Sequence, residues 1–80
     1  MPNTLRSPRH EALRVILVQE RKRAGLTQAR VASKLGRYQS FVALVESGQR
    51  RVDVVEFLEF AEVIGFNPQR ALSKILAAKK

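Results

Sequence analysis

The stretch Gly25–Gly48, which reads GLTQARVASKLGRYQSFVALVESG, decides the fold of this 80-residue chain. Its apolar residues recur at helical spacing in two short segments, 28–35 and about 38–46, with Gly36 between them. Glycine readily adopts the left-handed backbone that a tight turn between two helices often needs. The stretch therefore predicts a helix-turn-helix at about residues 27–46.

Helical periodicity continues on both sides of this pair. It predicts a helix over 9–24 before the pair, and helices over 54–64 and about 68–78 after it. Residues 1–8, with two prolines, lack such a pattern and are expected to form an irregular N-terminal arm. No segment alternates with the period of two that a half-buried strand requires. We therefore expect a single all-α domain of five helices over residues 9–80.

The apolar stripes of these helices predict which side chains face the core. In the segment before Gly48, the predicted inner cluster is Tyr38, Phe41, Val42 and Val45. On the last two helices, the predicted inward residues are Val54, Phe57, Leu58, Ala61, Ile64, Leu72, Ile75 and Leu76. Glu56, Glu59 and Glu62 recur every three residues and are expected to face water.

The composition excludes several classes of protein. The chain has no cysteine and one histidine, so we expect neither disulfides nor a metal site built on these residues. We find no arrangement of residues typical of an enzyme, and we expect no cofactor and no small-molecule substrate. No apolar run approaches the ~18 residues of a membrane span, and the N-terminus lacks a signal-peptide pattern. We therefore expect a cytoplasmic protein that has no membrane partner.

The charge is concentrated in one half of the chain. The formal net charge is +8. Residues 1–52 hold eleven basic and three acidic residues, whereas residues 53–80 hold four of each. A basic half joined to a neutral half is typical of a protein that binds a polyanion on one face. Nucleic acid is the partner that we expect from the charge, and a basic protein without such a partner is the alternative.

Four features of the Gly25–Gly48 stretch occur together: a Leu-Thr-Gln opening, a Leu-Gly turn, a Gln-Ser helix start and a Glu-Ser-Gly close. With them the chain resembles, over roughly residues 13–66, the XRE family of Cro- and phage-repressor-like regulators. The resemblance implies a lambda-repressor-like fold and a transcriptional regulator that binds double-stranded DNA sequence-specifically, which we expect to be a repressor. The alternative is an antitoxin-type module that binds a toxin protein as well as its own operator.

In a helix-turn-helix the second helix enters the major groove, and its outward N-terminal residues meet base edges. The expected base-contacting residues are Gln39, Ser40, Ala43 and Leu44. The expected phosphate-contacting residues are Thr27, Gln28, Arg37, Arg50 and Arg51, with the role of Gln28 implied by the resemblance. A surface without base contacts is an equally supported alternative for Ala43 and Leu44. Tyr38 and Leu44 depart from the family pattern, which favours modest specificity or a partner protein on this face.

Two further expectations concern internal structure and assembly. The resemblance implies that Arg21 pairs with Glu46, a carboxylate at the edge of an inner helix face where it requires a partner. Some apolar side chains of the last two helices remain after the inward-facing positions are assigned, and they predict a homodimer through the neutral C-terminal half. The expected interface residues are Phe60, Val63, Ala71 and Ile75. The alternative is that the rest of the same chain covers these side chains.

Overall fold

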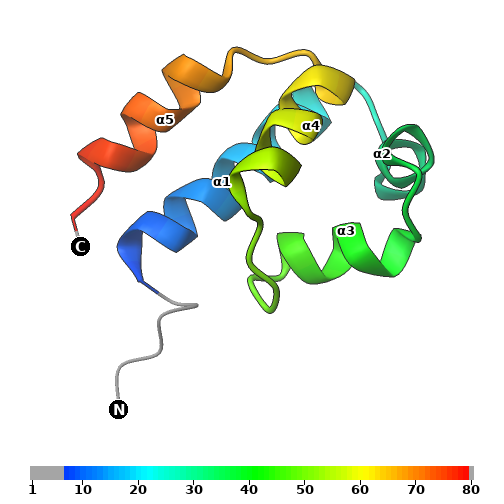
Figure 1. Cartoon of the computed structure of the whole chain (residues 1–80), viewed down its shortest axis with the longest axis horizontal. Helices are drawn as coiled ribbons and strands as arrows, with labels where there is room; N and C mark the ends of the chain where they lie inside the picture. Colours follow the sequence, from blue (N-terminus) through cyan, green and yellow to red (C-terminus); the bar gives the residue numbers. More distant parts are fainter. Residues whose placement is uncertain (1–6, 80) are drawn as a thin grey trace.

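The computed structural model describes residues 7–79, which form five helices and no strand. The helices are α1 (Pro8–Arg23), α2 (Gln28–Leu35), α3 (Gln39–Glu46), α4 (Val54–Ile64) and α5 (Pro68–Ala77) (Figure 1). The predicted all-α fold is confirmed, with α2 and α3 as the helix-turn-helix. Helix α1 packs against α3, α4 and α5, while α2 packs against α3 and α4. Within the described part of the chain, each helix is too short or too polar to cross a membrane.

The first helix begins at a side-chain cap. The Ser7 hydroxyl accepts a hydrogen bond of 3.1 Å from the backbone N–H of His10, and Pro8 occupies the first helical position. Proline suits this position because its fixed φ matches the helix and its missing N–H would have no helical partner there. Helix α1 thus begins at Pro8, one residue earlier than predicted, and residues 1–6 of the predicted arm lie outside the described part.

The turn between α2 and α3 is tight. Gly36 has a φ of 70°, and the N–H of Arg37 donates a hydrogen bond of 2.9 Å to the carbonyl of Ala32. This left-handed backbone places α3 directly after the end of α2. Helix α3 begins at Gln39, one residue later than predicted, and Tyr38 is its cap. Tyr38 is 86% exposed, so its predicted place in the inner cluster is wrong.

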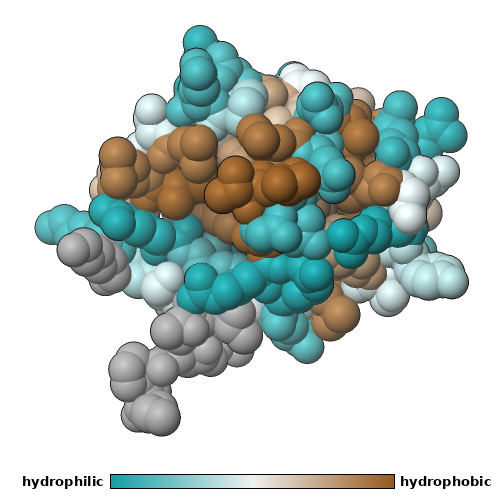
Figure 2. Space-filling view, viewed as in Figure 1, coloured by the Kyte–Doolittle hydropathy of each residue, from teal (hydrophilic) through white to brown (hydrophobic). Residues whose placement is uncertain are grey.

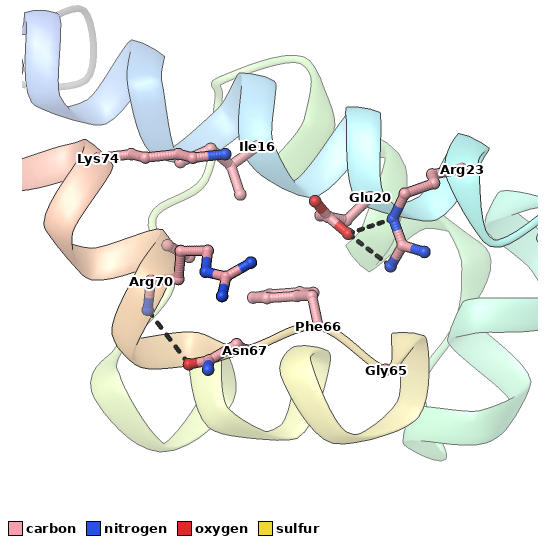
Figure 3. A pocket seen from close by; sticks show the side chains of 9 residues that line it. Ile16, Glu20, Arg23, Gly65, Phe66, Asn67, Arg70 and Lys74 are labelled. Carbon is pink, nitrogen blue, oxygen red and sulfur yellow. Dashed lines mark hydrogen bonds and ion pairs between the residues drawn. The ribbon is translucent and has the colours of Figure 1, made fainter.

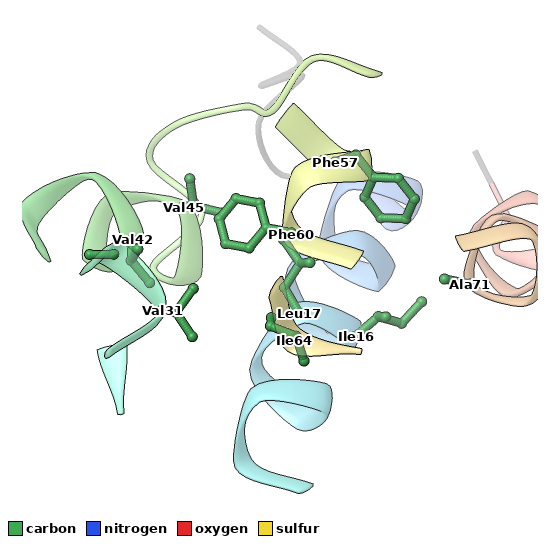
Figure 4. Packing of buried hydrophobic residues seen from close by; sticks show 10 residues of the cluster. Ile16, Leu17, Val31, Val42, Val45, Phe57, Phe60, Ile64 and Ala71 are labelled. Carbon is green, nitrogen blue, oxygen red and sulfur yellow. The ribbon is translucent and has the colours of Figure 1, made fainter. Parts of the chain in front are cut away.

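All five helices contribute side chains to one core. The largest side chains buried completely in it are Phe60, Leu17, Val31 and Val42 (Figure 4). The ring of Phe60 on α4 stacks on that of Phe41 on α3, with the ring centroids 6.0 Å apart. Complete burial of a phenylalanine side chain contributes about 1.5–3 kcal/mol to stability. This core packs α4 against the helix-turn-helix.

Helices α4 and α5 turn partly different faces to the core from those predicted. The buried apolar residues of α4 are Phe57, Phe60, Ala61 and Ile64. Val54 and Leu58 are exposed on α4, as are Leu72 and Leu76 on α5, so their predicted inward positions are wrong. Ala71 is buried instead, since a small side chain lets α5 lie close to α1. Both helices are apolar over more than one face, and periodicity alone did not select the buried one.

Candidate nucleic-acid interface

The N-terminal end of α3 presents polar side chains to solvent. Gln39 and Ser40, its first two residues, are both exposed. One turn later, Leu44 is 41% exposed and Ala43 is half-buried. Of the four residues predicted to contact bases, Ala43 therefore offers the least surface, while Gln39 and Ser40 offer hydrogen-bonding atoms.

The start of α2 offers a second polar site beside α3. Thr27 caps this helix by accepting a hydrogen bond of 3.0 Å from the N–H of Arg30. The hydroxyl keeps its own proton for donation, and the first N–H groups of a helix attract anions. Arg51 lies exposed in the loop that follows α3. The start of α2 therefore precedes the turn and α3 in the chain, and a basic loop follows α3.

Glu46, at the end of α3, is the centre of a buried polar cluster. Its carboxylate accepts hydrogen bonds from Arg21 Nε at 2.6 Å and Arg21 Nη2 at 3.0 Å, in a two-pronged ion pair. The side chains of Arg21 and Glu46 are only 12% and 8% exposed. Arg14 donates a further hydrogen bond of 2.9 Å to the backbone carbonyl of Glu46. The cluster thus joins α1 to the end of α3.

The same carboxylate also holds a residue predicted to contact phosphate. Gln28 Nε2 donates a hydrogen bond of 2.9 Å to Glu46 Oε1. An amide nitrogen carries two N–H groups, so one remains for another acceptor. Glu46 therefore fixes the orientation of Gln28 at the start of α2 without using all of its donors.

Glu56, in the first turn of α4, is the centre of a second cluster. Its carboxylate accepts hydrogen bonds from Arg37 Nη2 at 3.0 Å and from Arg50 Nη1 and Nη2 at 3.1 Å each. It also accepts the N–H of Asp53 at 2.9 Å, and the Asp53 carboxylate accepts the N–H of Glu56 at 2.7 Å. Both guanidinium groups lie over the ring of Phe41, at 4.3 Å for Arg37 and 4.6 Å for Arg50.

The prediction that Glu56 faces water is wrong, because the residue is buried. Its pKa lies below the ordinary range of a glutamate, first because Arg50 donates to it and then because the Asp53 N–H does. One signal in the sequence could have indicated this position. The residues Asp-Val-Val-Glu over 53–56 have the spacing of a capping box, which turns the glutamate back toward the start of its helix.

The four residues predicted for a dimer interface do not form one surface. Phe60 and Ala71 are buried in the core of the single chain, so neither offers a side chain to a partner. Val63 lines a hollow beside Leu35, whereas Ile75 lines a different groove on the α5 side of α4. The extra apolar residues of the sequence thus divide between the core and two separate surfaces.

A cavity of about 370 Å³ lies between α1 and the start of α5 (Figure 3). Phe66 and Ile16 form apolar parts of its wall, and Arg70 and Lys74 on α5 supply positive charge. The cavity contains none of the residues predicted to contact DNA. Between residues 7 and 79, no three residues of the metal-binding types lie close enough to share an ion.

Comparison with known proteins agrees with this geometry. The family model described as a helix-turn-helix domain matches residues 6–73. A solved structure, an XRE-family like protein from Pseudomonas syringae pv. tomato str. DC3000, is 46% identical with a TM-score of 0.81. The match covers 86% of this chain and 84% of that one. No curated protein matches. The chain belongs to the XRE-type family of helix-turn-helix proteins, a family of DNA-binding regulators.

Proposed function

We propose that this protein is a sequence-specific transcriptional repressor that inserts α3 into the major groove of its operator. The observation that carries the proposal is the exposed pair Gln39 and Ser40 at the start of α3, with the basic residues Arg37 before it and Arg50 and Arg51 after it. The width of the major groove admits one helix, whose first turn then lies nearest the base edges. Occupation of the operator by the protein blocks transcription from it.

Each exposed residue of α3 has a distinct role in this proposal. Gln39 carries an amide that can donate to N7 and accept from N6 of adenine, the arrangement that distinguishes adenine from other bases. Ser40 bonds a base or a phosphate. Leu44, which is exposed but has no polar side-chain atom, contacts the methyl group of a thymine.

Phosphate contacts hold α3 in register. Thr27 and Gln28 contact one phosphate at the start of α2, where the helix dipole and the free N–H groups favour an anion. Arg37, Arg50 and Arg51 contact phosphates beside the groove. Such contacts carry no sequence information themselves, but they fix which base pairs lie under Gln39 and Ser40.

We also propose that the repressor is a homodimer through its C-terminal half, at a groove that includes only Ile75 of the four interface residues expected from the sequence. A groove of about 200 Å³ runs beside α4 and α5 and is mostly apolar (Figure 2). The residues that line it are Leu13, Val52, Asp53, Val54, Phe57, Leu58, Leu72 and Ile75. A second copy suits this groove because residues 53–80 carry no net charge, so two copies approach here without repulsion.

Selection of bound DNA from random sequences tests the proposal. A dimer that inserts two copies of α3 should enrich a palindrome with half-sites about 34–36 Å apart, which is one turn of DNA. A single asymmetric site would contradict the dimer, and the absence of any enriched sequence would contradict sequence-specific binding. A small protein that co-purifies and covers α3 would favour the antitoxin-type alternative.

A further inference from the structure

We propose that Glu56 determines how strictly this protein discriminates between DNA sequences, by holding Arg37 and Arg50 in fixed positions beside α3. The inference rests on the proposed function. Glu56 itself is not expected to touch DNA, because it is buried beneath the two arginines. It is therefore a positioning residue, and its effect on binding passes through the guanidinium groups.

The geometry joins both ends of α3 to one carboxylate. Arg37 belongs to the turn immediately before α3, and Arg50 belongs to the loop after it. Glu56 Oε2 accepts from Arg37 Nη2 at 3.0 Å and from Arg50 Nη2 at 3.1 Å. Its other oxygen accepts from Arg50 Nη1 at 3.1 Å. A single side chain on α4 thus sets the distance between the two arginines.

An aromatic ring restricts the arginines further. Both guanidinium carbons lie within 4.6 Å of the centre of the Phe41 ring. This ring in turn stacks on Phe60, which is 1% exposed in the core. Stacking and ion pairing together leave each guanidinium little freedom to rotate. The positions of the arginines therefore follow from the packing of the whole domain.

The cluster still leaves the arginines able to bind phosphate. The side chains of Arg37 and Arg50 are 41% and 39% exposed. A guanidinium has five N–H groups, and Arg37 uses one of them on Glu56. An incoming phosphate thus meets donors that are already in place.

Fixed and free arginines have different consequences for specificity. Fixed guanidinium groups reach two phosphates only when the groove has the right width and α3 has the right register. Free arginines reach any nearby phosphate and strengthen binding to every sequence. Removal of the Glu56 charge therefore has two effects: affinity for unrelated DNA rises, and the advantage of the operator over unrelated DNA falls.

Glu56→Gln is the variant that tests this. Glutamine preserves the capping box, so the start of α4 remains intact while the charge is lost. Glu59→Gln is the matched control, because it makes the same charge change on an exposed side chain of the same helix. Dissociation constants are measured on the selected operator and on a scrambled duplex of equal length, with thermal unfolding to verify folding.

For Glu56→Gln we expect the ratio of the dissociation constant on the scrambled duplex to that on the operator to fall about tenfold. A change of this size is expected when roughly two side chains that were immobilised before binding become free to rotate. For Glu59→Gln both affinities should change together and leave the ratio as in the wild type. Equal ratios in Glu56→Gln and Glu59→Gln would overturn the inference. A wild type that does not discriminate at all would instead overturn the proposed function.

A second variant keeps the test valid if Glu56→Gln does not fold. Arg37→Lys combined with Arg50→Lys keeps both charges but loses the planar, two-pronged contact with the carboxylate. We expect its affinity for the scrambled duplex to stay within about twofold of the wild type, since counterion release depends on charge. Its affinity for the operator should fall toward its affinity for the scrambled duplex. An unchanged ratio in this double variant would also overturn the inference.

Discussion

Replacement of Glu46 by alanine should destabilise the domain more than any change at an exposed ion pair. The substitution leaves the guanidinium of Arg21, 12% exposed, without the carboxylate that holds it at 2.6 and 3.0 Å. An uncompensated buried charge of this kind costs about 3–5 kcal/mol. A domain of 80 residues has a total stability of roughly 4–12 kcal/mol, so much of it would be lost.

Urea unfolding at pH 7 measures this loss. Glu20→Ala is the matched control, because Glu20 pairs with Arg23 at 2.6 Å but the arginine is 59% exposed, and such pairs contribute less than about 1 kcal/mol. Arg21→Met combined with Glu46→Leu should cost less than Glu46→Ala alone, since no charge stays buried. If Glu46→Ala destabilised the domain no more than Glu20→Ala, the reasoning about the buried cluster would be refuted.

Three further predictions concern acid, salt and assembly. Because the pKa of Glu56 is lowered in the folded state, the ionised carboxylate stabilises the fold above about pH 4.3. The stability of the wild type relative to Glu56→Gln should therefore shrink as the pH falls through the lowered pKa and the carboxylate becomes protonated. Urea unfolding of both proteins across a pH series checks this, and a gap that widens toward acid would contradict it. In a salt titration of operator binding, Arg51→Ala should make the slope less steep by about 0.9 for each phosphate that Arg51 neutralises in the wild type, whereas Arg70→Ala on α5 should leave it unchanged. In sedimentation, Leu58→Glu should give monomers and Val55→Glu, exposed on α4 outside the groove, should remain dimeric; equal behaviour would exclude the groove as the interface.

The elements of the fold were predictable because local chemistry specifies them. Gly36 adopts the left-handed conformation that its place between two apolar segments indicated, and Asp53 and Asn67 cap the helices that they precede. These signals act within a few residues of the chain, where sequence spacing and spatial distance coincide.

The faces of α4 and α5 were not predictable in the same way. On α4, Val54 and Leu58 are as apolar as the buried Phe57 and Phe60, so the helical period fits more than one orientation. The choice depends on contacts with α2 and α1, which are distant in the sequence. The predicted dimer residues failed to form one surface for this reason.

The polar clusters illustrate a second limit. Glu56 recurs with Glu59 and Glu62 at a spacing typical of a solvated face, yet it is buried by Arg37 and Arg50 from two separate loops. A carboxylate pattern on one helix does not reveal cations that the fold brings from elsewhere. The sequence indicated the residues at the start of α3, but not the contacts that hold the neighbouring arginines.

Random-sequence selection with the wild type and Gln39→Ala tests most directly whether α3 reads bases in the major groove. We expect a palindrome for the wild type. For Gln39→Ala we expect the same palindrome without its preference at one position in each half-site. That loss should correspond to about 1–3 kcal/mol of discrimination at the position. Enrichment of the same bases to the same degree by both proteins would contradict the insertion of α3 with Gln39 at the base edges.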